Sequence, residues 1–202
     1  TMDKVILASG NQGKLQEHQN ILSNLAIELI PQPNTPEYEV EETGTTFIEN
    51  AIIKARHACA LSGLPAIADD SGLVIEALNG EPGVKTARYA GVGCSSQDNM
   101  DLILKKLKPF DDKQQRKATF VCALVYMRSE KDPLPIIAVG QWHGAITREK
   151  HGEKGFGYDP VFWDFKHKMT AAQMPKELKT KLSHRGQACK KLKQLLSKDW
   201  SK

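Results

Sequence analysis

Two adjacent carboxylates, Asp69 and Asp70, end an apolar run within the segment 65–75. A short apolar run that ends in acidic residues is typical of a buried strand opening on a polar site, and Gly72 allows the chain to turn directly behind it. Adjacent carboxylates repel, so a cation or hydrogen-bond donors must hold such a pair near a core. A surface turn is equally compatible with these residues, because Asp, Ser and Gly are common in turns.

A second candidate site follows the apolar run 4–8, where a glycine-containing turn at 9–13 leads to Lys14 and a helical pattern. Glycine lets backbone N–H groups approach an anion, a helix N-terminus favours negative charge, and Lys14 adds a full positive charge. The segment therefore has the parts of a phosphate-binding turn, although the spacing of a Walker A loop is absent. An ordinary strand-to-helix turn would have much the same sequence.

A third polar group surrounds the start of another predicted helix. Thr46 and Glu49 have the spacing of a capping box, so we expect a helix from there to Gly63. Glu41 and Glu42 stand immediately before it and can lean towards one polar stripe on its surface. A solvated helix face is the alternative interpretation of that stripe, which consists of Asn50, Lys54 and His57.

A glycine-rich turn at 155–160 carries two aromatic residues, Phe156 and Tyr158, of a type expected to be exposed. Such rings can stack on a nucleobase, or they can cap a core. Near the end of the chain, the segment 183–186 precedes a last predicted helix. The remaining pattern predicts strands at 26–30, 118–127 and 135–141, the last two as a hairpin, and a helix at 98–107.

The composition favours one globular domain, with two lobes as one possible arrangement, over residues 2–198. The chain has 202 residues, 40% of them hydrophobic, and a mean hydropathy of −0.43. No run approaches the roughly 18 apolar residues of a membrane helix, and no secretory pattern opens the chain. Thr1, before Met2, is expected to be an added residue. The four cysteines form no CxxC pair, which favours reduced thiols in the cytoplasm over disulfides or a zinc site.

Charge is distributed unevenly along the chain. Residues 166–202 contain 11 Lys/Arg and 2 Asp/Glu, a balance of +9, which leaves −5 of the overall +4 for residues 1–165. A basic end and an acidic body suit an anionic ligand that also needs a metal, although a solvated basic helix gives the same balance. The lysines lack interleaved aromatics, so a nucleic-acid-binding module is disfavoured.

Taken together, these segments resemble one family, the inosine/xanthosine triphosphate pyrophosphatases, which hydrolyse deaminated purine nucleotides. The resemblance covers nearly the whole chain, from residue 4 to about residue 195, and is specific because seven blocks occur in the family's order. The blocks are Ala8–Asn11 with Gly13–Lys14, Glu41–Gly44, Phe47–Ala51, Ala66–Leu73, Pro82–Gly83 with Ala87–Tyr89, Gly155–Pro160, and Ser183–Gly186. Small departures, such as Lys154 before the aromatic turn, do not touch the chemistry.

The resemblance implies an elongated α/β fold with a central twisted mixed sheet, helices on its sides, and an active-site cleft between two lobes. It also implies a homodimer that uses Mg²⁺ to cleave ITP, dITP or XTP between the α- and β-phosphates. Glu41 and Asp70 would hold the metal, and Asp70 would be the base. The substrate would contact Ser9, Gly10, Asn11, Gln12, Gly13, Lys14, Ser71, Phe156, Gly157, Tyr158, Asp159, Lys179, His184 and Arg185.

The chemistry of these residue types agrees with that activity. Mg²⁺ needs one or two carboxylates, and the chain offers Glu41, Glu42, Asp69 and Asp70. One is therefore free to orient or deprotonate water, and we assign that role to Asp70. Lys14, Lys54 and Lys179 would spread the charge on the phosphates. A donor from Arg185, or from the backbone near His184, would select the C6 keto group over the adenine amino group. The alternatives are a pyrophosphatase for modified pyrimidine triphosphates and a nucleotide sensor that does not cut.

Overall fold

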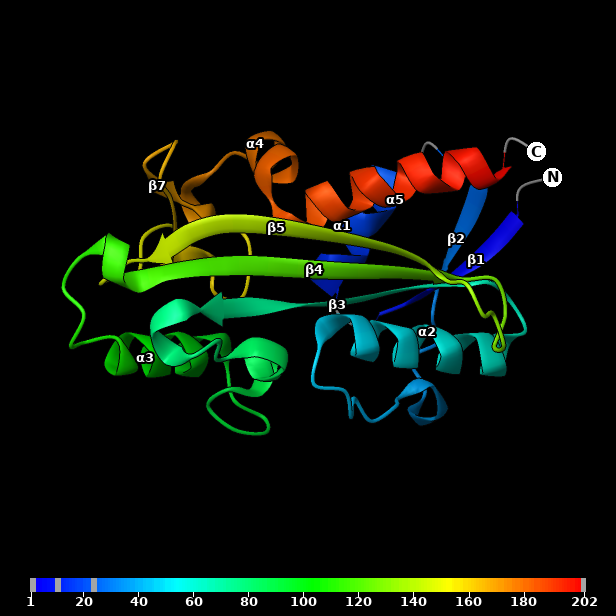
Figure 1. Cartoon of the computed structure of the whole chain (residues 1–202), viewed down its shortest axis with the longest axis horizontal. Helices are drawn as coiled ribbons and strands as arrows, with labels where there is room; N and C mark the ends of the chain where they lie inside the picture. Colours follow the sequence, from blue (N-terminus) through cyan, green and yellow to red (C-terminus); the bar gives the residue numbers. More distant parts are fainter. Residues whose placement is uncertain (1–2, 10–11, 23–24, 201–202) are drawn as a thin grey trace. The chain divides into compact units, whose positions relative to one another are not determined.

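The computed structural model describes residues 3–9, 12–22 and 25–200. The predictions that concern Thr1, Gly10 and Asn11 lie outside these residues. Figure 1 labels the main elements along the chain. The strands are β1 (Asp3–Ala8), β2 (Ile27–Pro31), β3 (Ala66–Ile75), β4 (Lys117–Met127), β5 (Ile136–Ile146), β6 (Phe162–Asp164) and β7 (Met169–Thr170). The α-helices are α1 (Gln12–Leu22), α2 (Phe47–Ser62), α3 (Ser96–Lys106), α4 (Lys176–Leu182) and α5 (His184–Trp200).

The strands form one mixed sheet in the order β2-β1-β3-β4-β5-β6-β7. β1 runs parallel to both β2 and β3, with Ala8 opposite Ala68, whereas β6 runs antiparallel to β5 and β7. The predicted α/β class with a central mixed sheet is therefore confirmed. The hairpin prediction also holds, because β4 and β5 are neighbours in the sheet and consecutive in the chain, although β5 continues to Ile146.

The chain divides into two compact units, each with its own hydrophobic core. The first contains residues 1–70, 122–140 and 184–202, and the second contains residues 71–121 and 141–183. β3, β4 and β5 each contribute residues to both units. Among the described residues, none of the helices is both long enough and apolar enough to cross a membrane.

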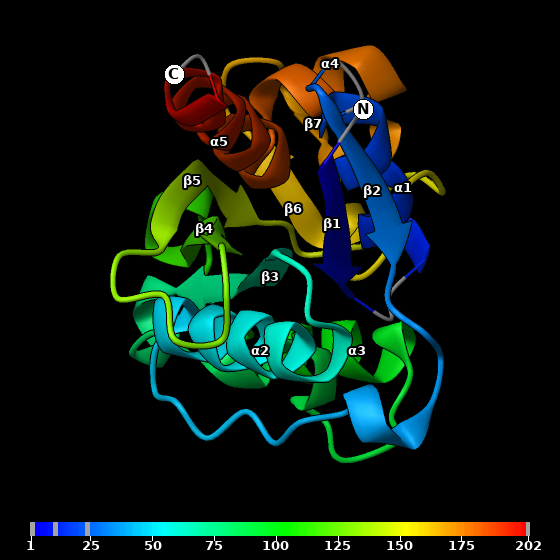
Figure 2. The same cartoon turned by 90° about the vertical axis from the view of Figure 1, so that its right-hand side faces the viewer.

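In the first unit, alternate residues of each strand enter different clusters, because successive side chains of a strand point to opposite faces. Val5 and Leu7 pack with residues of α1 and α5, whereas Ile6 and Ala8 pack with Ala51 and other residues of α2. Figure 2 shows α1 and α5 together on one side of these strands and α2 on the other. This alternation decides where each polar side chain of β3 points.

The second unit is built around an aromatic cluster. The rings of Phe120 and Trp142 both lie against Phe162, with centroids 4.3 and 4.8 Å away, and Met100 and Ile103 of α3 pack in the same core. α3, predicted at 98–107, starts two residues earlier, behind a capping box between Ser95 and Asp98. The core thus fixes the strand ends and loops of this unit.

The helix α2 confirms the local sequence signals. Thr46 accepts a hydrogen bond from the backbone of Glu49 at its N-terminus, and Gly63 ends it with a left-handed φ of 69°. Ile48, in the first turn of α2, is 38% exposed. The expectation of a sharp turn at Gly72 is wrong: β3 continues through both carboxylates and ends at Ile75. Similarly, α5 already begins at His184, so most of the segment 183–186 is helical.

Candidate active site

Asp69 and Asp70 are neighbours on β3 and both are buried, but they have different partners. Asp69 contacts residues of α1, α5 and β4, while Asp70 contacts Lys54 of α2. The strand alternation explains the difference, because adjacent side chains point to opposite faces of a sheet. The repulsion expected between adjacent carboxylates is thus relieved by giving each one its own cations.

Lys54 links the two acidic segments that the sequence analysis placed near each other. Its Nζ lies 2.8 Å from Oε1 of Glu42 and 3.3 Å from Oδ1 of Asp70, and it also donates to the backbone carbonyl of Asp69. These contacts confirm that the segment before α2 leans towards Lys54. Burial lowers the pKa of Lys54, but the carboxylates of Asp70 and Glu42 outweigh that effect and raise it above its usual value.

Asp70 has the electrostatics of a general base. Burial raises its pKa, Lys54 opposes the rise and Glu42 adds to it, and the result is a pKa of about 6. Its Oδ2 is buried and has no hydrogen-bond partner among the described residues. A carboxylate whose pKa lies near neutral pH can accept a proton from water and later release it.

The acidic segment is held on α2 through Gly44. The side chain of Asn50 accepts a hydrogen bond from the backbone N–H of Gly44, at 2.7 Å, and donates one to its carbonyl. A Cβ at Gly44 would lie 2.7 Å from both Asn50 Oδ1 and Glu49 Cβ, closer than side-chain atoms pack. Only glycine permits this approach, which fixes the chain two residues after Glu42.

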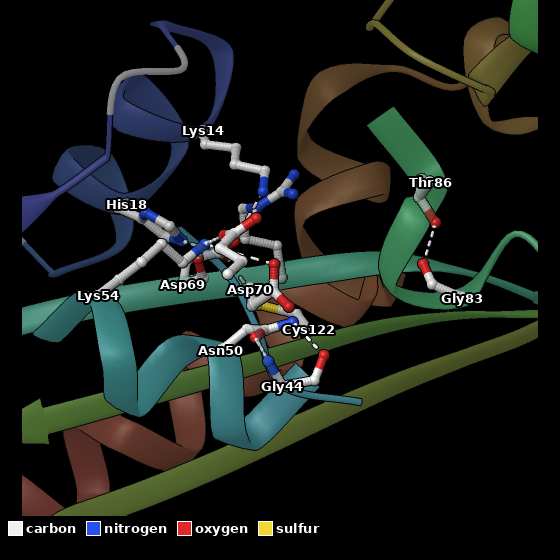
Figure 3. A network of polar contacts seen from close by, with 12 residues as sticks. Lys14, His18, Gly44, Asn50, Lys54, Asp69, Asp70, Gly83, Thr86 and Cys122 are labelled. Carbon is white, nitrogen blue, oxygen red and sulfur yellow. Dashed lines mark hydrogen bonds and ion pairs between the residues drawn. The ribbon is translucent and has the colours of Figure 1, made fainter. Parts of the chain in front are cut away.

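Around Asp69, the side chains of Lys14, His18 and Cys122 converge on one carboxylate (Figure 3), and Arg185 approaches it as well. Lys14 Nζ lies 2.9 Å from Oδ1; His18 Nε2, Cys122 Sγ and Arg185 Nε lie 3.1, 3.1 and 3.5 Å from Oδ2. Burial alone would raise the pKa of Asp69, but Lys14, the His18 hydrogen bond and Arg185 together hold it well below its usual value. Asp69 is therefore ionised throughout the physiological pH range.

The second unit contains the aromatic turn. Asp159 is buried, and its Oδ2 accepts hydrogen bonds from the backbone of Phe156 and, at 2.7 Å, from Lys179 of α4. Lys179 Nζ also lies 5.0 Å from the centroid of the Phe156 ring. Gly155, with a φ of 76°, leaves no room for a Cβ, which would meet Asp159 Oδ2 at 2.1 Å. The turn thus presents the half-buried Phe156 ring on a fixed backbone.

Two of the predicted contact residues are buried. The Tyr158 ring is buried in the aromatic core and its hydroxyl donates to the backbone carbonyl of Thr86, so it is a support for the turn and not an open stacking surface. Arg185 is also buried, and its guanidinium contacts Glu17 through Nη1 and Asp69 through Nε.

The remaining predicted residues are placed as follows. Ser9 comes directly after β1, Gln12 and Gly13 begin α1 with side chains outside the described set, Ser71 continues β3, and Gly157 has a left-handed φ of 61°. Glu41 is exposed and His184 is buried.

The comparisons with known proteins agree with this geometry. The model of the Ham1 family matches residues 5–195. The chain belongs to the Ham1 family. A protein of Idiomarina loihiensis named dITP/XTP pyrophosphatase is 52% identical over 202 residues, covering 98% of this chain and all of its relative. A Shigella flexneri protein of the same name is 50% identical over 191 residues, covering 95% and 96%.

Solved structures of Ham1 proteins have the same fold. The structure of a HAM1 protein from Coxiella burnetii matches with a TM-score of 0.91 and 47% identity, and it covers 98% of this chain and all of the other. The Ham1 protein of Staphylococcus aureus matches with a TM-score of 0.86 and 40% identity over the same shares. The predicted recognition and fold class are therefore confirmed.

The residues around Asp70 fit a divalent cation. Mg²⁺ prefers oxygen ligands, and this Ham1 chain gathers Glu42 and Asp70 around Lys54, with Glu41 next along the chain. The buried Oδ2 of Asp70, which has no hydrogen-bond partner in the described part of the chain, would gain one. A nearby cation would also favour the ionised form that burial disfavours.

Three contact residues were missed by the sequence analysis: Glu17, His18 and Cys122. A signal existed for two of them. Glu17 comes three residues after Lys14 and His18 comes four residues after it, so all three occupy neighbouring positions on the surface of a helix. Cys122 gave no signal, since its contact with Asp69 depends on the pairing of β4 beside β3.

Proposed function

We propose that this chain is a nucleoside-triphosphate pyrophosphatase that hydrolyses deaminated purine nucleoside triphosphates, such as dITP, XTP and ITP, to the monophosphate and pyrophosphate. Its membership of the Ham1 family and its 52% and 50% identity to proteins named dITP/XTP pyrophosphatase support this activity. The reaction removes noncanonical nucleotides before they can be used.

The observation that carries the proposal is the environment of Asp70. Its carboxylate is buried, its pKa is raised to about 6, and its Oδ1 lies 3.3 Å from Lys54. We assign Oδ2, which has no hydrogen-bond partner in the described residues, to accept the proton of the attacking water. Near pH 7 most Asp70 is ionised and ready for this transfer.

The cations of the chain would bind the triphosphate, which carries about four negative charges near neutral pH. Lys14 at the start of α1 and Lys54 of α2 supply positive charge in the first unit, and Lys179 supplies it in the second. Glu41 and Asp70 would hold Mg²⁺, with Glu42 as a further carboxylate beside Lys54. When bound, the metal would neutralise phosphate charge and lower the pKa of the water.

Base selection would rest on the keto group at C6 of hypoxanthine and xanthine. A protein N–H there can donate a hydrogen bond to the keto oxygen but faces an adenine amino group, itself a donor, unfavourably. Buried polar contacts of this kind discriminate strongly. We keep the backbone near His184 as the candidate donor. The Arg185 guanidinium, which contacts Glu17 through Nη1 and Asp69 through Nε, is the second candidate.

The deciding experiment is a panel of nucleoside triphosphates, including ITP, dITP, XTP, ATP, GTP and modified pyrimidine triphosphates, with saturating Mg²⁺ and both products identified. We expect pyrophosphate from dITP, XTP and ITP, with a much smaller rate on ATP. Preference for a pyrimidine would favour the alternative pyrophosphatase, and binding without pyrophosphate release would favour a sensor. Equal rates on ATP and ITP would refute keto selection.

Replacing Asp70 by Asn should then abolish most pyrophosphate release at saturating Mg²⁺, by a factor of about 10² or more. Asp132→Asn is the matched control, because Asp132 is also a buried carboxylate of the first unit but accepts hydrogen bonds only from Arg128 and the backbone of Leu134 among the described contacts. Near-normal turnover of the Asp70 variant would exclude it from the mechanism.

We also propose that residues 2–198 form a single catalytic domain. The expected homodimer and the cytoplasmic location are part of the same proposal, and they rest on the resemblance and on the cysteine pattern. Sedimentation of the purified chain in the presence and absence of Mg²⁺ and dITP would test the dimer.

A further inference from the structure

We propose that Asp69 is a positioning residue for Lys14 and Arg185 and that it does not bind Mg²⁺. This inference rests on the proposed function, because Lys14 is expected to contact the triphosphate. Asp69 is adjacent to Asp70 in the sequence, and the residue types alone allow either of them to bind a metal. The structure separates their roles.

The contacts of Asp69 already satisfy both of its oxygens. Lys14 bonds to Oδ1, and three groups approach Oδ2: the imidazole of His18, the thiol of Cys122 and Nε of Arg185. The residue is 2% exposed, so no solvent competes for these positions. A metal ion at Asp69 would lie beside a lysine at Oδ1 or an arginine at Oδ2, both of which repel it.

The strand geometry points the same way. In β3, Asp69 lies two residues after Ile67, and Asp70 lies two residues after Ala68, so each pair shares one face of the strand. Ile67 and Ala68 belong to different core clusters. Glu42 and Asp70 both contact Lys54 of α2, whereas the Asp69 carboxylate contacts α1 and α5, on the other side of the strands. Metal ligands and Asp69 thus belong to different faces.

Asp69 connects two elements that carry predicted substrate contacts. Lys14 belongs to α1 and Arg185 to α5, and Arg185 also bonds to Glu17 of α1 at 2.8 Å. Without the negative charge of Asp69, two buried or half-buried cations would lose their shared counter-ion. Lys14 would then sample several orientations instead of one, and a misplaced binding group weakens substrate binding and turnover.

His18 supports the same carboxylate. Its side chain is fully buried, and its Nε2 lies 3.1 Å from Asp69 Oδ2. Glutamine at this position can still donate a hydrogen bond from its amide, whereas leucine cannot. Two variants of similar size therefore separate loss of the hydrogen bond from loss of buried volume.

The test compares steady-state kinetics with dITP across Mg²⁺ concentrations. For Asp69→Asn we expect kcat/KM to fall about 10- to 100-fold, mainly through KM, with the half-saturating Mg²⁺ concentration unchanged. Glu41→Gln serves as the comparison for a metal ligand, and its half-saturating Mg²⁺ should rise. Asp132→Asn should leave KM and the Mg²⁺ dependence at wild-type values.

A double-mutant cycle identifies the partner. If Asp69 acts through Lys14, Asp69→Asn should cost much less in a Lys14→Gln background than in the wild type. Should Asp69→Asn fail to fold, His18→Leu and His18→Gln replace it: KM should rise with leucine and return towards the wild-type value with glutamine.

Three outcomes would overturn the proposal: a Mg²⁺ dependence shifted in parallel with that of Glu41→Gln, full additivity with Lys14→Gln, or an unchanged KM in Asp69→Asn. If the wild type releases no pyrophosphate from any triphosphate, the proposed function fails instead. The role of Asp69 is then measured by the affinity for Mg²⁺–dITP in calorimetry, with the same variants and the same expected order.

Discussion

At the scale of single residues, the site shows how environment divides two identical side chains. Asp69 and Asp70 are both buried, yet the pKa of Asp69 is held well below its usual value and that of Asp70 is raised to about 6. Burial acts in the same direction on both. The number of cations decides, because Asp69 has Lys14 and Arg185 within contact distance and Asp70 has Lys54 alongside the like charge of Glu42.

The raised pKa of Asp70 predicts a stability change with pH in the metal-free protein. The folded state binds the proton more tightly than the unfolded chain, so ionisation of Asp70 destabilises the fold as pH rises from about 4 to above 6. Two pKa units correspond to at most about 3 kcal/mol. In EDTA, Asp70→Asn should therefore be more stable than the wild type at pH 8, and the difference in the free energy of unfolding should be smaller at pH 5.

Urea unfolding at both pH values, in EDTA and in Mg²⁺, measures this difference. Added Mg²⁺ should raise the stability of the wild type and have little effect on Asp70→Asn, because the variant lacks the carboxylate charge. Asp132→Asn is again the control and should be destabilised at both pH values, since Asp132 has a lowered pKa and satisfies two backbone N–H groups. A destabilised Asp70→Asn at pH 8 would contradict the prediction.

The residue types predicted the chemistry of the site but not which side chains contact one another. Carboxylates at 41–42 and 69–70 and the lysines 14 and 54 were all identified from local spacing. Which carboxylate faces which lysine depends on the face of β3, and that is set by strand pairing far along the chain. The burial of Arg185 could not be predicted from the sequence either, because its partner Glu17 lies 168 positions away.

At the scale of elements, caps and glycines fix where the acidic segment lies. Thr46 begins α2 and Gly63 ends it, as the sequence indicates, while Gly44 allows the preceding chain to approach Asn50. Local signals predicted these ends well because they depend on neighbours only a few residues away. The course of β3 was not predictable in this way, since partner strands keep it extended through Gly72.

A methyl group at Gly44 should disturb the site more than the fold. In Gly44→Ala the Cβ would meet Asn50 Oδ1 and Glu49 Cβ at 2.7 Å, so the chain before α2 must shift and move Glu42 relative to Lys54. We expect stability to fall by about 1–3 kcal/mol and the half-saturating Mg²⁺ concentration to rise. Thr46→Ala, which removes only the cap, should cost about 1 kcal/mol and leave the Mg²⁺ dependence unchanged.

In the second unit, the hydroxyl of Tyr158 joins the aromatic turn to the segment Gly83–Arg88. It donates to the Thr86 carbonyl at 2.7 Å, and the Thr86 hydroxyl accepts from the backbone of Leu73. Tyr158→Phe leaves a carbonyl without this partner and should cost about 1–3 kcal/mol of stability in urea unfolding. KM for dITP should also rise if the turn contacts the base. Unchanged stability would show that the hydrogen bond forms only transiently.

At the scale of the whole molecule, two cores share three strands. β3, β4 and β5 each place residues in both units, so the strands that hold one core together also hold the other. A unit that unfolded alone would have to leave half of each strand without its core. Strand sharing therefore predicts a single cooperative transition, although the chain contains two compact units.

Probes specific to each unit can test this coupling. Trp142 and Trp163 lie in the second unit, so their fluorescence reports on it in a Trp200→Phe background. Cys59, Cys122 and Cys189 are buried in the first unit, so thiol labelling reports on that unit in a Cys94→Ser background. We expect both probes to give the same urea midpoint, because neither core keeps its strands after the other is lost. Midpoints separated beyond experimental error would show that the units unfold independently and that the three shared strands can break where they pass from one unit to the other.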